Sequence, residues 1–225
     1  ALRSTPTYEI GNKPLYKKNY IPVLMYHDFQ ENITPEQESA IVHPQLFEEQ
    51  IQALLKDGYI FITFNDLYLY LVGKGGLPPK PVIITADDGY LSNYEIAFPI
   101  LKKYNIPATY FITTQYIGTT TMYPHFTWNH AKEMEESGLV DIQSHTHAHL
   151  LMSKLPKDEV IYQALVSFGL IEQKLGERDV KVLSYPQFYN NKKTRKLLEE
   201  VGVDLQVTNL AKKSFSKTQL TDVKR

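Results

Sequence analysis

The stretch PVIITADDGY, residues 81–90, joins a buried-strand pattern to two adjacent carboxylates. Its first four residues form a continuous apolar run, which is typical of a strand covered on both faces. Asp87 and Asp88 follow, and like charges this close repel each other unless a cation lies between them. In one interpretation, one Asp binds a cation while the other moves protons. In the other, the pair simply belongs to a turn in which Gly89 supplies a positive φ.

Strand-like and helix-like segments alternate along the chain from residue 21 onward. Short apolar runs typical of strands lie at residues 21–26, 59–64, 81–86, 108–113, 140–144, 180–185 and 205–208. Helical spacing lies between them, from 44 up to 58, from 65 or 66 to 71, and at 94–104, 128–137, 158–175 and 193–201. Such alternation predicts a parallel sheet covered by helices, either open or closed into a barrel, with about seven strand–helix units.

Local signals predict where three of these helices begin or end. Pro99 lies inside the segment 94–104 and implies a late start or a kink. Asn65 or Asp66 can cap the second helix, and Gly176 ends the helix at 158–175. The apolar residues of that last helix that we expect on one face are Ile161, Leu165, Phe168 and Leu175.

Polar side chains follow the carboxyl ends of several predicted strands. These residues are His27, Asp87, Asp88, His145 and Gln187. In a (β/α) barrel the active site lies at this face. The placement therefore favours a barrel over an open sheet, and it predicts that residues distant in sequence meet at one site.

Composition excludes several classes of protein. The 225 residues suffice for one domain, which we place at residues 20–225 after an arm or linker at 1–19. The 24 basic and 25 acidic residues give no basic surface for nucleic acid. No apolar run approaches the ~20 residues of a membrane span. The chain starts at Ala1 and carries no signal-peptide pattern, and the sequence leaves open whether a signal or anchor was removed.

Three of the seven histidines lie within five residues, at His145, His147 and His149. In an extended strand His145 and His149 would be ~13 Å apart, too far for one ion, so we expect a turn directly after the strand. One helical turn would bring positions four apart onto one face. Alternatively, His145 and His147 share a strand face. The sequence leaves this choice open, and a solvated histidine-rich loop is the plain alternative to both.

The absence of cysteine restricts the metal sites that the chain can form. Any metal must be bound by nitrogen and oxygen atoms. A carboxylate with two imidazoles leaves open positions for water and substrate, which suits a catalytic zinc or similar ion. Such an ion lowers the pKa of bound water, and a second carboxylate nearby can take the proton.

The sequence resembles the polysaccharide deacetylase family, metal-dependent carbohydrate esterases with a chitooligosaccharide-deacetylase homology domain. The resemblance runs from Ile21 to about Thr208 and is carried by four segments: Leu24–His27, Thr85–Tyr90, Ser144–His149 and Ser184–Pro186. It implies a distorted (β/α) barrel with fewer than eight complete units. It also implies a subgroup that acts on exopolysaccharide-type poly-N-acetylglucosamine or on related cell-wall glycans.

The resemblance also implies a role for each motif residue. Asp88, His145 and His149 would bind a divalent metal ion, with zinc first and cobalt, nickel or iron as alternatives. Asp87 would be the general base that deprotonates the metal-bound water, which attacks the acetyl carbonyl of an N-acetylglucosamine unit. The backbone N–H of Gln187 would help to stabilise the oxyanion.

Two departures from the family pattern bear on this reading. The arginine that buttresses the base in many members would fall at Ser184, as it does in subgroups that lack it. The general-acid histidine of the family lies late in the chain, and no histidine follows His149 here. His27 is a candidate substitute. Otherwise water or another group protonates the leaving amine, or the chain is a weak or inactive glycan-binding protein of the cell envelope.

Further residues receive weaker predictions. The residues that we expect to contact substrate are Tyr90, Trp128, Tyr185 and Pro186. Trp128 also fits core packing, and we expect His125 and His130 to be surface groups and His43 to be a helix-entry residue. We expect a monomer that acts on polysaccharide outside the cell or at its surface.

Overall fold

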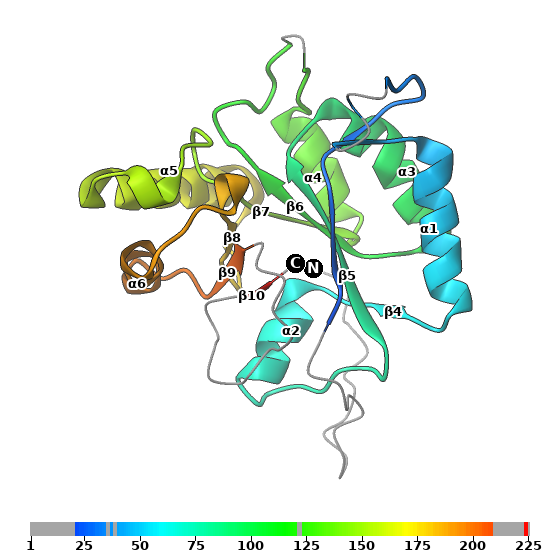
Figure 1. Cartoon of the computed structure of the whole chain (residues 1–225), viewed down its shortest axis with the longest axis horizontal. Helices are drawn as coiled ribbons and strands as arrows, with labels where there is room; N and C mark the ends of the chain where they lie inside the picture. Colours follow the sequence, from blue (N-terminus) through cyan, green and yellow to red (C-terminus); the bar gives the residue numbers. More distant parts are fainter. Residues whose placement is uncertain (1–20, 35–36, 38–39, 121–122, 209–222, 225) are drawn as a thin grey trace.

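A curled parallel sheet with helices around it forms the molecule (Figure 1). The sheet has eight strands among the described residues, in the order β1-β5-β6-β7-β8-β9-β10, with β4 paired to β5. Within this part of the chain no pairing joins β10 to β1, so the curl is that of an incomplete barrel. This confirms the expectation of a distorted (β/α) barrel. The computed structural model describes residues 21–34, 37, 40–120, 123–208 and 223–224, and the predicted arm at 1–19 lies outside them.

All seven predicted strands and all six predicted helices are present, some with shifted ends. The strands of the sheet are β1 (Val23–Tyr26), β4 (Ile60–Phe61), β5 (Pro81–Asp88), β6 (Ala108–Ile112), β7 (Val140–Ser144), β8 (Val182–Ser184), β9 (Leu205–Thr208) and β10 (Val223–Lys224). A separate pair is formed by β2 (Asp28–Phe29) and β3 (Ile41–Val42). The helices are α1 (Pro44–Lys56), α2 (Phe64–Leu71), α3 (Phe98–Tyr104), α4 (Trp128–Glu136), α5 (Lys157–Leu175) and α6 (Lys192–Glu200).

Helix α2 fills the inside of the curl. Its residues Phe64, Leu67 and Leu71 are buried and pack in one cluster with Ile83 of β5 and Phe111 of β6. Figure 1 shows α2 in the lower part of the molecule, where the strands begin. The interior at that end is therefore a packed apolar core, and polar side chains inside the curl are left to the other end.

The remaining helices cover the outer face of the sheet. Phe47 of α1, Leu101 of α3 and Met134 of α4 pack with Tyr110 and Ile142 of the strands in one cluster. Helices α5 and α6 form a second outer cluster over β8. None of the described helices combines the length and the apolar character needed to cross a bilayer.

Strand register places the future site residues on the inner face. Asp87 of β5 aligns with Phe111 of β6, and Phe111 aligns with Gln143 of β7. Phe111 belongs to the inner cluster. Because aligned residues of neighbouring strands point to the same side, Asp87 and Gln143 point inward too.

The predicted start of α2 is wrong by a few residues. Neither Asn65 nor Asp66 is the N-cap, because Thr63 takes that place. The Thr63 hydroxyl accepts a hydrogen bond from Asp66 N at 3.1 Å, and the Asp66 carboxylate accepts one from Thr63 N at 2.8 Å. This reciprocal capping box starts the helix at Phe64 and shortens the predicted strand at 59–64.

Two other helix predictions meet different outcomes. The helix around Pro99 starts late, as expected, because a π-helical turn, η1 (Asn93–Ala97), precedes α3 and puts Pro99 in its first turn. In α5 the predicted apolar face is confirmed in part, because Phe168 is buried and Ile161 and Leu175 pack against the core. Leu165 is 50% exposed, whereas Gln163 and Ser167 are buried. The buried side chains of Gln163 and Ser167 have polar hydrogen-bond partners, so hydrophobicity alone does not locate the buried face of α5.

Candidate active site

The end of β5 carries the two carboxylates of the site. Asp87 is buried at 1% exposure. Asp88 has φ 72° and Gly89 φ 88°, so the chain leaves the strand through two left-handed residues. A Cβ atom on Gly89 would lie 3.1 Å from Ile117 Cδ1 and 3.3 Å from Ile112 Cγ2. The turn interpretation of the Asp-Asp-Gly motif is thus correct, and it coexists with a polar site.

The histidine segment after β7 bends as predicted, although not as a helical turn. Thr146 has φ 72° and His149 φ 56°. The Thr146 hydroxyl accepts a hydrogen bond from His149 N at 3.1 Å, and Ala148 N donates to Gln163 Oε1 of α5 at 2.8 Å. A left-handed Thr is strained because its Cβ is branched. These contacts hold the strained segment in place.

Three potential ligand atoms converge between these two segments. Asp88 Oδ1 lies 3.5 Å from His145 Nε2 and 3.4 Å from His149 Nε2. All three ligand atoms lie within 4.8 Å of one another. Tetrahedral zinc with bonds of about 2.0–2.2 Å has ligand atoms roughly 3.3–3.5 Å apart. The arrangement therefore fits a small divalent cation.

The third histidine of the segment points elsewhere. His147 Nδ1 lies 2.9 Å from Thr114 Oγ1, and its ring meets Tyr162 of α5 edge-on at 6.1 Å. Among the described residues the group of converging ligand atoms contains His145 and His149 but not His147. The geometry thus disfavours the alternative His145–His147 ligand pair.

Asp87 lies against the ligand group without belonging to it. Its Oδ2 atom is 3.6 Å from His145 Nε2. The Ser184 hydroxyl lies 3.5 Å from the same oxygen, at the outer limit of a hydrogen bond. His145 Nδ1 donates to the Ser184 carbonyl oxygen at 2.9 Å. Ser184, which stands at the position of the buttressing arginine, therefore contacts both the carboxylate and the imidazole.

Comparison with known proteins agrees with this geometry. A sequence model of the family described as polysaccharide deacetylase matches residues 74–205. The chain belongs to the polysaccharide deacetylase family. Its matched span includes Asp87, Asp88 and both histidines of the ligand group.

Individual relatives cover much of the chain. YxkH of Bacillus subtilis (strain 168) is 32% identical over 188 residues, which make up 84% of this chain and 64% of YxkH. A poly-beta-1,6-N-acetyl-D-glucosamine N-deacetylase of Staphylococcus epidermidis is 31% identical over 89% of this chain and 76% of its own length. The Streptococcus pyogenes deacetylase PplD, solved in complex with acetate, superposes with a TM-score of 0.82 at 27% identity, covering 93% of this chain and 92% of PplD. The chain spans less than two thirds of YxkH.

A cavity of about 460 Å³ opens beside the ligand group of this deacetylase-family chain. Its lining includes both Asp88 and His149 and is otherwise formed by Tyr90, Gln115, Tyr116, Thr119, Tyr123 and His125. The loop between β6 and α4 supplies most of these residues. Leu91 N donates to Pro124 O at 2.8 Å, which ties that loop to the segment after Gly89. The aromatic loop thus forms one wall of the site.

His125 corrects a prediction made from the sequence. It is not a surface group, since it is 9% exposed and its ring lies 5.1 Å from that of Tyr90. Burial lowers the pKa of His125, although the charge of Asp88 opposes this shift. Burial also raises the pKa of Tyr90, and Asp88 adds to that effect. The cluster of Tyr116, Tyr123 and His125 in this loop is the signal that could have located the cavity.

Two predicted catalytic residues follow the carboxyl ends of β1 and β8. His27 is half-buried between β1 and β2, and its carbonyl oxygen accepts a hydrogen bond from Asn93 Nδ2 at 2.6 Å. Its ring lines none of the described cavities. Gln187 is exposed and left-handed, with φ 49° and ψ 21°, in the short turn η3 (Pro186–Phe188) after β8.

Three predicted substrate contacts lie in the core instead. Tyr185 is fully buried, and its hydroxyl donates a short hydrogen bond to Gln206 Oε1. Pro186 is buried beside it. Trp128 packs against the outer core cluster at the start of α4. Since Tyr185 follows an inward-pointing residue of β8, it points outward toward α5 and α6, which strand alternation would have revealed. Only Tyr90 of the four lines the cavity.

Proposed function

We propose that this chain removes N-acetyl groups from polysaccharide that contains N-acetylglucosamine. The observation that carries the proposal is the convergence of Asp88, His145 and His149 beside a separate buried carboxylate, Asp87. Family membership supports the reaction, and the relative named for poly-beta-1,6-N-acetyl-D-glucosamine supports the substrate class. Because such polymers lie outside the cell, we propose that the chain acts there or at the cell surface.

Asp88, His145 and His149 would hold a divalent metal ion, with zinc as the first choice and cobalt, nickel or iron as alternatives. Their nitrogen and oxygen atoms suit each of these ions. A bound ion of this kind supplies a Lewis acid that lowers the pKa of water and polarises a carbonyl oxygen. The remaining steps fall to residues of the chain.

Asp87 would accept the proton of the attacking water. It is a carboxylate next to the ligand group, and its burial excludes competing solvent. The backbone N–H of Gln187, in the left-handed turn after β8, would donate to the developing oxyanion. When the carbon–nitrogen bond breaks, the proton held by Asp87 is available for the leaving amine. This path needs no histidine late in the chain and no contact from His27.

The aromatic wall would bind the sugar. Tyr90, Tyr116 and Tyr123 line the cavity beside Asp88 and His149. Aromatic rings offer flat apolar faces with a polar tip, which suits the apolar face and the hydroxyl groups of a pyranose ring. We therefore assign substrate contact to these tyrosines rather than to Tyr185, Pro186 or Trp128.

Acetate release from β-1,6-linked N-acetylglucosamine oligomers tests the proposal. The zinc- or cobalt-loaded chain should release acetate, and Asp87→Asn should reduce kcat by about 10³-fold with the metal content unchanged. Asp158→Asn, an exposed position on α5, serves as the matched control and should keep full activity. Binding of oligomer by the loaded wild type without acetate release would contradict the proposal and favour a glycan-binding protein.

A further inference from the structure

The contact between β7 and β8 is the narrowest of the central strand pairs. One register position, Ser144 opposite Leu183, joins β7 to β8. By comparison, five positions join β6 to β7 and three join β8 to β9. His145 follows β7, and the carbonyl that accepts its Nδ1–H belongs to β8. We call this narrow contact between β7 and β8 the seam. The orientation of the His145 ring thus depends on how the seam holds the two strands together.

The side chain of Gln143 spans the seam below that position. Its Oε1 atom accepts a hydrogen bond from Val182 N at 2.9 Å, and its Nε2 atom donates to Val180 O at 2.9 Å. The residue is 2% exposed. The Gln143 amide donates to the backbone carbonyl of Val180 and accepts from the backbone N–H of Val182. The backbone of a neighbouring strand would make the same two kinds of hydrogen bond. Gln143 therefore replaces missing backbone pairing.

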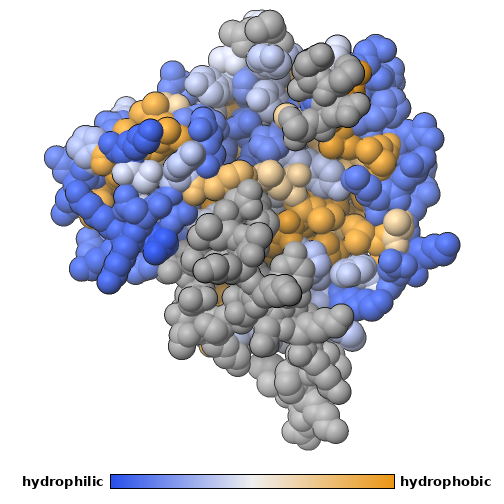
Figure 2. Space-filling view, viewed as in Figure 1, coloured by the Kyte–Doolittle hydropathy of each residue, from blue (hydrophilic) through white to orange (hydrophobic). Residues whose placement is uncertain are grey.

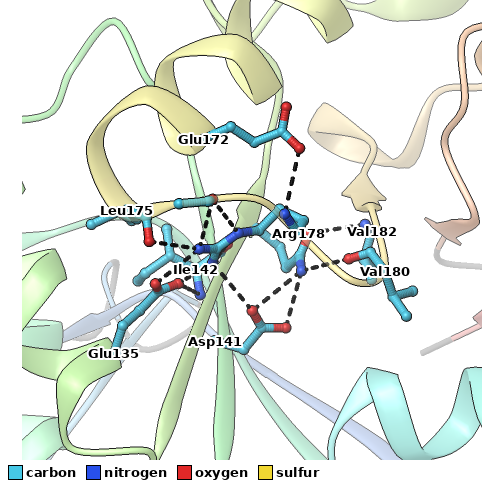
Figure 3. A network of polar contacts seen from close by, with 10 residues as sticks. Glu135, Asp141, Ile142, Glu172, Leu175, Arg178, Val180 and Val182 are labelled. Carbon is cyan, nitrogen blue, oxygen red and sulfur yellow. Dashed lines mark hydrogen bonds and ion pairs between the residues drawn. The ribbon is translucent and has the colours of Figure 1, made fainter. Parts of the chain in front are cut away.

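A charged network fixes the lower end of the same seam (Figure 3). Gln143 Nε2 lies 3.2 Å and 3.1 Å from the two carboxylate oxygens of Asp141. The Arg178 guanidinium, on the loop that leads into β8, donates to both carboxylate oxygens of Glu135 on α4 and to Leu175 O at 3.1 Å. The amide of Gln143 is thus held from both directions.

The imidazole of His145 joins the two strands at the upper end of the seam, through its contact with Ser184 O. Because a carbonyl oxygen only accepts hydrogen bonds, the contact with Ser184 O requires a proton on Nδ1. In the neutral ring this leaves the lone pair of Nε2 directed at Asp87 and Asp88. Ser184 lies two residues beyond Val182, on the same face of β8. A shift of β8 at Val182 would therefore move the acceptor of His145.

We propose that Gln143 is a positioning residue for His145. Its amide holds β8 in register, so that the Ser184 carbonyl fixes the tautomer and the orientation of the imidazole. The role of His145 as a metal ligand rests on the proposed function. The coupling between Gln143 and the ring does not, because every contact in it lies within the metal-free chain.

Nitrogen-15 NMR of the histidine rings in the metal-free chain tests this coupling. In the wild type His145 should be a single Nδ1–H tautomer whose ring proton exchanges slowly with solvent. Gln143→Met keeps the length of the side chain and removes both hydrogen bonds. It should mix the tautomers and speed exchange of that proton at least tenfold. Zinc affinity should fall about tenfold, as for loss of other outer-shell partners.

A second buried glutamine provides the control. Gln206 of β9 is fully buried and makes two hydrogen bonds, to the Tyr185 hydroxyl and to Arg195 O, on the outer face of the sheet. Gln206→Met should lower stability without changing the tautomer of His145. Gln143→Glu keeps an acceptor for Val182 N, loses the donor to Val180 O, and gives a second variant in which exchange should again be faster than in the wild type.

Unchanged tautomer and exchange of His145 in folded Gln143→Met, or an equal change in Gln206→Met, would overturn the proposal. Failure of the proposed function has a different signature. In that case the wild type would bind no zinc or release no acetate, while the ring of His145 would still respond to Gln143→Met and not to Gln206→Met.

Discussion

Carboxylates lie at both ends of the curled sheet, and their neighbours differ in kind. Where the strands begin, Asp141 lies 3.7 Å from the guanidinium of Arg178 (Figure 3). Where the strands end, Asp88 lies 3.4–3.5 Å from the imidazoles of His145 and His149. A guanidinium carries a permanent charge, whereas an imidazole can be neutral.

This difference separates a structural carboxylate from a functional one. A guanidinium compensates buried negative charge at any pH that the protein meets. A neutral imidazole does not, but its free nitrogen can bind a metal ion. We therefore propose that a cation from outside the chain binds at the upper end, whereas Arg178 compensates charge at the lower end. Figure 2 shows hydrophilic surface over much of the visible face, with apolar side chains gathered in separate patches.

The largest expected effect is the loss of folding stability when the charged network at the lower end of the sheet is disrupted. Arg178→Met should reduce the free energy of unfolding by about 3 kcal/mol, because Glu135 and Asp141 are left buried without their cation. Chemical denaturation measures the change. Lys132→Met is the control, since the pair of Lys132 with Glu136 is exposed and should contribute less than about 1 kcal/mol. Equal effects in the two variants would show that the lower network is not a structural clamp.

The next effect concerns the turn at the upper end. Gly89→Ala should cost about 2 kcal/mol of stability and weaken metal binding, because a positive φ is combined with close contacts to Ile117 and Ile112. Gly202 also has φ 88°, with nothing within 4 Å of a Cβ atom. Gly202→Ala should therefore cost about 1 kcal/mol from backbone strain alone and leave metal binding unchanged. Equal losses of metal affinity would contradict the account of the turn.

A pH titration sharpens the comparison at the lower end. Burial raises the pKa of Asp141 to about 6, while its hydrogen bond from Gln143 and the charge of Arg178 act in the opposite direction. The folded chain thus binds this proton more tightly than the unfolded chain. Stability from this group should rise by about 1 kcal/mol as the pH falls from 7 to 5. Denaturation of the wild type and Asp141→Asn at both pH values measures it, and parallel pH profiles would refute the shift.

The smallest effect concerns the aromatic wall. Tyr116→Ala should raise KM for the oligomer about threefold to fivefold with kcat nearly unchanged, because the ring lines the cavity and, in our proposal, contacts substrate away from the reacting atoms. Tyr162→Ala, at an exposed ring on α5, should change neither value. A fall in kcat without a change in KM would instead connect Tyr116 with the chemistry.

The sequence predicted most elements of this fold because their signals are local. Apolar runs located the seven strands, and Pro99 located the late start of α3. The start of α2 was missed because two residues compete for the cap. Asp66 looks like an N-cap, yet it acts from the third position of a helix that Thr63 begins. The position of α2 inside the curl depends on which side of the sheet it packs against, and spacing within the helix does not encode that.

The site was predictable where motif and strand end coincide. Asp87 and Asp88 end β5, His145 and His149 follow β7, and the curl of the sheet brings them together. His125 and the tyrosines of its loop were missed as a wall of the cavity because a long loop has no periodicity that fixes its path. Gln143 was read only as part of a strand, since its partners on β8 lie 37 and 39 residues away.

Metal titration of the isolated chain tests the central claim most directly. Calorimetry with zinc should give one ion per chain for the wild type and His147→Ala. In Asp88→Ala and His149→Ala, affinity should fall by at least about 100-fold, because each removes one of the three converging ligand atoms. Tight binding that survives Asp88→Ala and His149→Ala, or is lost in His147→Ala, would contradict the account.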